Sequence, residues 1–255
     1  LNETIEDLRY NINELEIIKK IIKQKKPDFV FHLAAQPLVN EAYIKPLETF
    51  TTNGIGTLNM LESLRELNQK CVTIFITSDK CYFNKEWIWG YRETDEIGGF
   101  DPYSGSKGVA ELILRSYFKS YFNKDHPVKI GIGRAGNVVG GGDWAMNRII
   151  PDIVKSWSKN EDLVLRNPNS TRPWQHVLEP LSGYLKLAEH LSDSIGSNGE
   201  AFNFGPSSDE EFSVLDLVKE MSKYWTNVRW AVEKHNNNIN YESTLLKLNC
   251  DKAIA

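Results

Sequence analysis

Cysteine and long apolar runs are scarce in this 255-residue chain. The three cysteines, Cys71, Cys81 and Cys250, are odd in number and lack the spacing of a zinc site. This argues against a disulfide framework or a bound metal, and for reduced thiols in a cytoplasmic compartment. No apolar run approaches the length of a membrane span, and no signal segment opens the sequence. The sequence therefore predicts a cytoplasmic protein with no membrane partner.

An excess of positive charge is also missing. The 30 Lys and Arg residues are outnumbered by 34 Asp and Glu residues, for a net charge of -4. Without a basic field, the chain is not expected to bind nucleic acid. Its 41% hydrophobic and 25% charged residues are typical of a globular protein with a substantial core.

Helix and strand patterns alternate through the first half of the chain. Leu15, Ile18 and Ile22 form the apolar stripe of one helix, and apolar β-branched runs indicate buried strands. The alternation predicts an α/β fold, a Rossmann-like parallel sheet with helices on both faces. The expected helices span 13–25, 46–67 and 102–122, and the expected strands span 28–35, 72–78 and 128–135.

The pattern changes after residue 137, where glycine-rich and polar loops separate shorter elements. We predict a Rossmann-like domain over 1–138 and a smaller substrate-binding lobe over 139–255, part of which returns to the first domain. The expected elements here are helices at 148–158, 179–191 and 214–225 and strands at 163–166 and 201–204.

Two neighbouring segments carry a cluster of reactive side chains. Tyr103 and Lys107 are four residues apart, so on a helix they share one face. A nearby ammonium favours the phenolate and is expected to lower the tyrosine pKa toward neutrality. Ser78, Asp79 and Lys80 directly follow a predicted strand, where open α/β sheets bind their ligands. Taken alone, Tyr-x-x-x-Lys also fits an ordinary helix, and Asp79 with Lys80 also fits an exposed ion pair.

Longer sequence blocks resemble the extended short-chain dehydrogenase/reductase superfamily and, within it, the CDP-glucose 4,6-dehydratase family. The resemblance implies a Rossmann-like fold, NAD as cofactor, CDP-glucose as the small-molecule substrate, and a homodimer or dimer of dimers. The blocks that carry it are Phe31–Val39, Thr77–Tyr82, Glu86–Glu93, Gly98–Ser104, Arg134–Ala145, Arg172–Tyr184 and Asn203–Pro206.

The resemblance also implies catalytic roles. Tyr103 matches the base that takes the proton of the sugar 4-hydroxyl, and Lys107 matches its pKa-lowering partner. Ser78 matches the hydroxyl that positions the 4-oxygen. Asp79 stands at the place of the acid that protonates the departing 6-hydroxyl, and Lys80 at the place of the base that removes the C5 proton.

Binding residues are implied in the same way. The expected cofactor contacts are Asn11, Ile12, Leu33, Ala34, Ala35, Gln36, Thr77, Tyr103, Lys107 and Arg134, and the expected substrate contacts are Asn137, Arg166, Arg172 and Trp174. Asn11 stands where the family usually has aspartate, but its amide can still accept a hydrogen bond. Trp174 fits core packing equally well.

Two helices, over 46–67 and 102–122, match those that form an intermolecular four-helix bundle in the superfamily. The second carries more apolar side chains than one core-facing stripe requires, so part of it is expected to face a partner. These side chains are Leu112, Leu114, Tyr117, Phe118, Tyr121 and Phe122.

One family feature is missing from the sequence. No G-x-x-G-x-x-G turn precedes residue 11, so the loop that normally cradles the dinucleotide phosphates is absent, and this chain by itself is expected to hold NAD poorly. Three alternatives stay open: a 4,6-dehydratase of another nucleotide sugar, a 4-epimerase, and a catalytically incomplete fragment. An epimerase has no need of Asp79 and Lys80 together, and Tyr103 counts against the inverting UDP-N-acetylglucosamine dehydratases.

Overall fold

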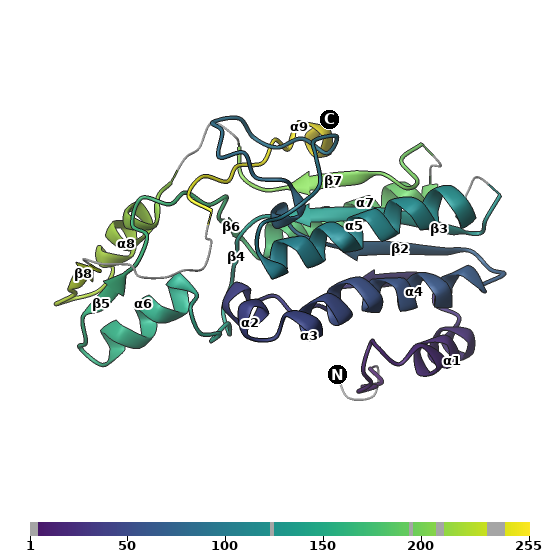
Figure 1. The fold of residues 1–255 in the computed structure, drawn as a ribbon, viewed down its shortest axis with the longest axis horizontal. Coiled ribbons are helices and arrows are strands. Elements are labelled where there is room, and N and C mark those ends of the chain that lie inside the picture. Colours follow the sequence, from purple (N-terminus) through teal and green to yellow (C-terminus); the bar gives the residue numbers. More distant parts are fainter. Residues whose placement is uncertain (1–4, 123–124, 194–195, 208–211, 234–242) are drawn as a thin grey trace.

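A four-stranded parallel sheet forms the centre of the computed structural model, which describes residues 5–122, 125–193, 196–207, 212–233 and 243–255. The strands lie in the order β1 (Phe29–His32), β2 (Cys71–Ile76), β3 (Val128–Ala135) and β7 (Ala201–Phe204) (Figure 1). Each pair is parallel, and the connections between them contain helices. The predicted α/β Rossmann-like sheet is confirmed.

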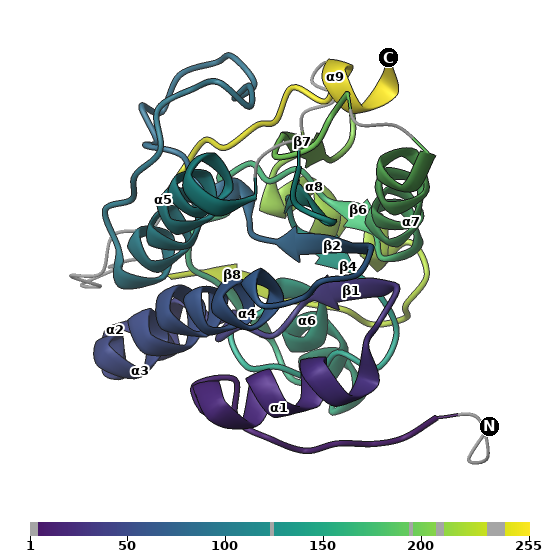
Figure 2. The same cartoon turned by 90° about the vertical axis from the view of Figure 1, so that its right-hand side faces the viewer.

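Helices cover both faces of the sheet. Figure 2 shows α4 (Gly56–Arg65) and α5 (Pro102–Tyr121) on one side and α7 (Leu178–Asp193) on the other. Successive side chains of a strand point to opposite faces. Phe75 of β2 therefore packs in the cluster of α1 (Leu15–Lys25), α4 and α5, while its neighbour Ile74 packs against α7. A Cβ added to Gly131 of β3 would lie 2.7 Å from Leu191, so glycine allows α7 to approach the sheet closely.

The predicted helix over 46–67 is interrupted. It consists of α3 (Pro46–Phe50), a π-helical turn η1 (Thr51–Ile55) and α4, and it is preceded by α2 (Val39–Ile44). Within η1 the side chain of Asn53 is buried, accepts a hydrogen bond from the Gln36 backbone N–H (2.8 Å) and donates one to Ser106 Oγ (2.8 Å). We attribute the wider turn to these tertiary contacts, which hydrophobic periodicity does not report.

The start of α5 is defined by its first residues. Asp101 accepts hydrogen bonds from the backbone N–H groups of Tyr103 (2.9 Å) and Ser104 (3.0 Å), and Pro102 occupies the first turn. An N-cap aspartate followed by proline is a strong helix start. Tyr103 is thereby held in the first turn of α5, close to the end of β2 and the short 3₁₀ turn η2 (Asp79–Cys81).

A second, smaller core lies apart from the sheet, at the left of Figure 1. It is built from two distant stretches of chain that meet where β5 pairs with β8. Between them, α7 and β7 return to the main sheet. The boundary at 138/139 stays a prediction. The elements of this core are α6 (Ile149–Ser158), β5 (Leu163–Leu165), α8 (Val214–Ser222) and β8 (Trp230–Val232).

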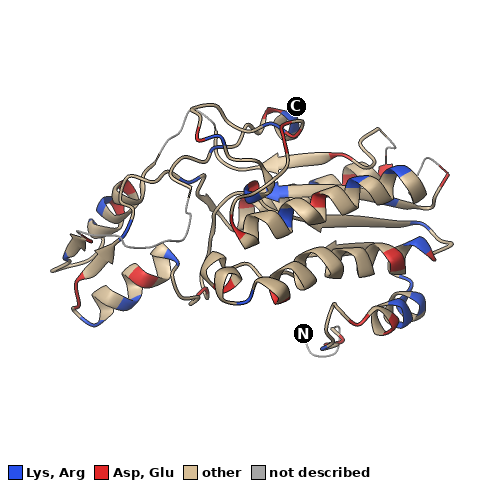
Figure 3. Cartoon of the chain, in the orientation of Figure 1, with Lys and Arg blue, Asp and Glu red and all other residues tan. Residues whose placement is uncertain are grey.

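Short elements complete the chain. β4 (Val138–Val139) pairs with β6 (Gln175–His176), and α9 (Asp251–Ile254) ends it. Figure 3 shows cationic and anionic residues interspersed along the helices. In the described part of the chain, no helix has both the length and the apolarity of a membrane span, and no three His, Cys, Asp or Glu side chains are placed to hold a metal.

Candidate active site

A cavity of about 550 Å³ opens at the carboxyl ends of β2 and β3 and extends to α6 and β5 of the smaller core. Open parallel sheets bind ligands at this edge. All four expected substrate contacts and most of the expected catalytic residues line it. The lining residues that sequence analysis singled out are Thr77, Ser78, Asp79, Lys80, Tyr103, Asn137, Arg166, Arg172 and Trp174.

Ser78 is the centre of the hydrogen bonds on the cavity wall. Its hydroxyl donates to Asp79 Oδ1 (2.9 Å) and accepts from the backbone N–H of Lys80 (3.2 Å). It also lies close enough to Tyr103 to lower the pKa of that phenol. One serine at the end of β2 thus lies beside both the carboxyl group and the phenol.

The pKa of Tyr103 differs from the expectation. Burial raises it to about 12, and this outweighs the opposing effects of the Ser78 hydrogen bond and the Arg148 charge. The expected lowering toward neutrality is wrong for the protein residues alone, since burial has the largest effect on this pKa and Lys107 is not among the groups with the largest effects. Desolvation of the phenolate is the stronger effect here.

Lys107 is buried one turn along α5, with 5% of its surface exposed. Burial lowers its pKa to about 8, opposed by the nearby Cys81 and Glu111. Its charge in turn helps burial to lower the pKa of His32, at the end of β1, to about 4. Among the described residues the ammonium has no hydrogen-bond acceptor. A buried amine without an acceptor is suited to receive one from a ligand.

Asp79 is the other incompletely satisfied group. Its Oδ2 is buried without a hydrogen-bond partner in the described part of the chain, although the residue lines the cavity. Burial raises the pKa of this carboxyl group, against the opposing effects of Lys80, Ser78 and Arg172. The protonated form is thereby favoured, as a proton donor requires.

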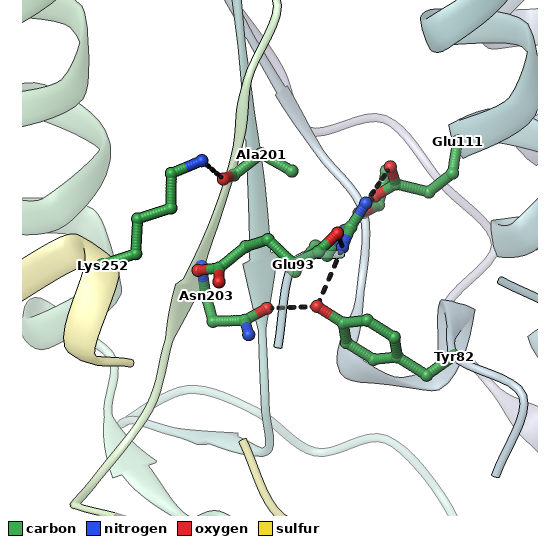
Figure 4. Close-up of polar contacts among 8 residues, drawn as sticks. Tyr82, Glu93, Glu111, Ala201, Asn203 and Lys252 are labelled. Atoms are coloured by element: carbon green, nitrogen blue, oxygen red, sulfur yellow. Dashed lines mark hydrogen bonds and ion pairs between the residues drawn. The ribbon is translucent and has the colours of Figure 1, made fainter. Parts of the chain in front are cut away.

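Arg134 occupies a different environment from the one expected of a cofactor contact. Its guanidinium forms a two-fold ion pair with Glu111 (both contacts 2.8 Å) and donates to the Tyr82 hydroxyl (2.8 Å). Tyr82 in turn donates to Asn203 Oδ1 (2.7 Å), and Figure 4 shows this hydrogen bond as a dashed line. The residue is buried outside the cavity lining, and these contacts give it a structural role. Its predicted contact with the cofactor stays a prediction.

The segment Leu33–Gln36 leaves the end of β1 next to this site without lining the cavity. Leu33 is 51% exposed, and Gln36 is anchored by Asn53 through both its backbone N–H (2.8 Å) and its carbonyl (3.1 Å). These contacts make Asn53 an anchor of the segment. Contact of Leu33, Ala34, Ala35 and Gln36 with NAD stays a prediction.

Asn11 and Ile12 lie before α1, outside the cavity lining. Asn11 Oδ1 accepts from the Asn13 backbone N–H (3.0 Å), and the Ile12 carbonyl accepts from Asn59 (3.1 Å). Ile12 also packs against the main core. The predicted contact of Asn11 and Ile12 with the cofactor stays a prediction.

Three residues near the site had no signal in the sequence. Arg148 lines the cavity and acts on Tyr103, Glu111 accepts from the hydroxyl of Thr77 (2.5 Å), and Ser243 accepts from the amine of Lys80 (3.2 Å). Each is distant in sequence from the residue that it contacts, so only the fold brings the pairs together.

The sequence matches known proteins over nearly its whole length. The family described as GDP-mannose 4,6 dehydratase matches residues 2–248. The chain is 44% identical to the CDP-glucose 4,6-dehydratase of Salmonella typhimurium over 99% of its own length and 71% of that protein. It is 27% identical to the UDP-glucose 4-epimerase of Mycoplasma pneumoniae, of which it spans 61%.

Solved structures show the same fold. The dTDP-glucose 4,6-dehydratase of Bacillus anthracis, in complex with NAD, has a TM-score of 0.75 at 20% identity and is covered to 71%. The UDP-glucuronic acid 4-epimerase of Bacillus cereus, in complex with UDP-glucuronic acid and NAD, has a TM-score of 0.80 at 21% identity and is covered to 73%. Each alignment covers 96% of this chain.

Proposed function

We propose, from the premise that this chain belongs to the GDP-mannose 4,6-dehydratase family within the extended short-chain dehydrogenases/reductases, that it dehydrates CDP-glucose to CDP-4-keto-6-deoxyglucose with NAD. One observation carries the proposal: Ser78, Asp79, Lys80 and Tyr103 line a single cavity together with the expected nucleotide-sugar residues. The identity to the Salmonella CDP-glucose enzyme supports the choice of substrate.

The residues present fit a bound NAD. The buried Lys107 ammonium has no hydrogen-bond acceptor among the described residues and suits the ribose hydroxyls of the nicotinamide half. Thr77 lies at the cavity wall, and Leu33–Gln36 run along the adjoining sheet edge. A bound NAD would supply the oxidant for C4 and the hydride for C6.

The side chains divide the remaining chemistry among them. As the phenolate, a form that burial disfavours in the protein residues alone, Tyr103 accepts the proton of the sugar 4-hydroxyl. Ser78, which bonds Asp79 and lies beside Tyr103, orients that oxygen. Ketone formation at C4 acidifies the C5 proton, which the neutral amine of Lys80 removes. Asp79, whose burial favours the protonated carboxyl group, gives its proton to the departing 6-hydroxyl.

The diphosphate and the base are assigned to the other side of the cavity. Arg166 and Arg172 are cationic groups that line the cavity, and a guanidinium binds phosphate oxygens bidentately. The charge of Arg172 acts on Asp79, so we assign this arginine to the part of the phosphate site nearest the reacting end of the sugar. Asn137 and Trp174 complete the wall.

Competition between nucleotide sugars tests the proposal. The full-length protein is given equal CDP-, dTDP-, UDP- and GDP-glucose with NAD, and the 4-keto-6-deoxy products are separated. We expect the CDP product to dominate. Equal turnover of dTDP-glucose would exclude the assigned substrate, and a 4-epimer without loss of water would exclude the reaction.

We further propose a homodimer formed through α3, η1 and α5. Leu47 (81% exposed), Ile55 (44%) and Leu112 (49%) are large apolar side chains exposed on these elements. Leu114 and Phe122 were also expected on the partner-facing surface. Both are fully buried in the subunit core, so they do not belong to that surface. Light scattering at micromolar concentration should give twice the subunit mass, and Leu112→Lys should shift it toward a monomer.

The cytoplasm is the proposed location. Cys71, Cys81 and Cys250 are all free and buried, which suits a reducing compartment.

A further inference from the structure

The segment 243–250 returns from the smaller core and runs beside the loop 83–92, as the yellow and blue traces in Figure 1 show. Tyr91 pairs with it on both sides, because its N–H donates to the Lys247 carbonyl (3.0 Å) and its carbonyl accepts from the Asn249 N–H (2.9 Å). Leu246 and Leu248 are buried against Tyr82 and Tyr91. We call residues 243–250 the return segment.

Glu86 fixes the first residues of the return segment. Its carboxylate accepts from the N–H (3.0 Å) and hydroxyl (2.5 Å) of Thr244 and from the N–H of Leu245 (2.7 Å). Asn84 adds a bond to the Leu245 carbonyl (3.0 Å). Glu86 has a left-handed backbone (φ 53°), which is uncommon for a residue with a side chain and is held here by these contacts.

This anchoring places Ser243 against the proposed base. Ser243 is 3% exposed, and its hydroxyl accepts a hydrogen bond from the amine of Lys80 at 3.2 Å. Lys80 has a long, flexible side chain, and catalysis requires its nitrogen in one position. An amine keeps N–H donors in both its charged and its neutral form, so the bond persists when the lone pair becomes free to accept a proton.

We propose that Ser243 is a positioning residue for the elimination step, holding the amine of Lys80 at the cavity wall. This proposal rests on the function proposed above and adds to it a residue 163 positions distant from the base that it serves. It also gives the loop 83–92 a purpose, since Glu86 and Asn84 set the position of Ser243 through residues 244 and 245.

A small second cavity next to Ser243 bears on how strongly loss of the serine hydroxyl should slow elimination. It measures about 10 Å³ and is lined by Lys80, Asn84, Ser104 and Ser243, among others. This is about the space of one water molecule, and removal of the serine hydroxyl would enlarge it. Water can then replace part of the lost contact, so Ser243→Ala should weaken elimination moderately and not abolish it.

The test compares Ser243→Ala, Ser243→Thr and the control Ser222→Ala in the full-length protein with NAD and CDP-glucose. Ser222 lies on α8, and its hydroxyl donates to the Lys219 carbonyl of the same helix (2.7 Å). We expect Ser243→Ala to slow C5-proton exchange with solvent about tenfold, equivalent to ~1.4 kcal/mol, while single-turnover oxidation at C4 changes less than about twofold. Ser243→Thr should restore C5 exchange, and Ser222→Ala should change neither rate.

A second measurement separates this proposal from the proposed function. Acylation of lysines, followed by peptide mass spectrometry, reports the accessibility of the Lys80 amine without turnover. Ser243→Ala should raise Lys80 labelling severalfold, and Ser243→Thr should not. If labelling changes but no nucleotide sugar reacts, the contact stands and the function fails. Unchanged labelling together with unchanged C5 exchange, or equal loss of both half-reactions, would overturn the positioning role.

Discussion

Two buried cations, Arg134 on β3 and Lys107 on α5, have the same small exposure of 5% but opposite surroundings. Arg134 is paired with Glu111, bonded to Tyr82 and stacked 5.0 Å from the Tyr82 ring. Burial opposes its charge, but Glu111 overrides burial and raises the pKa of Arg134. For Lys107 burial prevails, and the pKa falls to about 8.

The same contrast holds for two carboxyl groups. Glu111 is bonded by Arg134 and Thr77, whereas one oxygen of Asp79 has no partner within the described ranges. Groups satisfied by the protein support the fold, and groups left incomplete at a cavity are available to a ligand or a reaction. Stability and catalysis should therefore respond to different members of these pairs.

The largest effect is expected at the reacting cluster. Tyr103→Phe removes the proposed base for the 4-hydroxyl, so turnover should fall by ~10²–10⁴-fold and no bound NADH should form on adding substrate. Lys80→Met keeps the side-chain stem, so NADH should form while C5 exchange and water loss stall. Rapid-mixing absorbance measures NADH formation and solvent-isotope exchange measures loss of the C5 proton, so together they distinguish the two variants. Normal C5 exchange in Lys80→Met would assign the C5 base elsewhere.

Removal of the paired cation, Arg134, should strongly destabilise the fold. Arg134→Met leaves Glu111 buried and uncompensated, which costs about 3–5 kcal/mol in the free energy of unfolding. Urea denaturation measures this loss in the free energy of unfolding. The control Arg134→Met with Glu111→Leu removes both charges and should recover most of the loss. An Arg134→Met protein of unchanged stability that binds NAD weakly would restore the original cofactor assignment.

Removal of the unpaired cation should have the opposite sign. The pKa of Lys107 is lowered from 10.5 to about 8, so folding disfavours the charged form, and the penalty is complete below about pH 8. In protein freed of NAD, Lys107→Met should therefore be more stable than the parent at pH 7, by up to about 3 kcal/mol. The difference should shrink as the pH rises from 8 toward 10.5. A destabilised variant at pH 7 would show that Lys107 is paired in solution.

A stability effect of the same sign is expected at Asp79. Because burial raises its pKa, the stabilising contribution of the protonated form is present below the ordinary value of 3.8 and is lost as the pH rises through the folded value. Asp79→Asn should thus be more stable than the parent at neutral pH, and the gap should close on acidification. It should also slow water loss ~10²-fold while C5 exchange falls less. Thermal unfolding at several pH values measures the stability effect, and the rate of formation of the dehydrated product measures the effect on water loss.

Much of the fold follows from local pattern. The strands at 128–135 and 201–204 and the helix that begins at Pro102 are found where the sequence places them, because buried runs, apolar stripes and a strong N-cap are local signals. The π-helical turn at Thr51–Ile55 was not predictable in this way, because the contacts of Asn53 come from Gln36 and Ser106.

The candidate site likewise has features that follow from local sequence and features that follow only from tertiary contacts. The sequence by itself determined which side chains are chemically competent, and it put Ser78, Asp79 and Lys80 at a strand end and Tyr103 with Lys107 on one helical face. Only the tertiary structure decided which of them are satisfied: Arg134 is paired inside the fold, Lys107 is not, and Lys80 meets Ser243 from the far end of the chain. The physical reason is that desolvation and pairing depend on neighbours that sequence distance does not reveal.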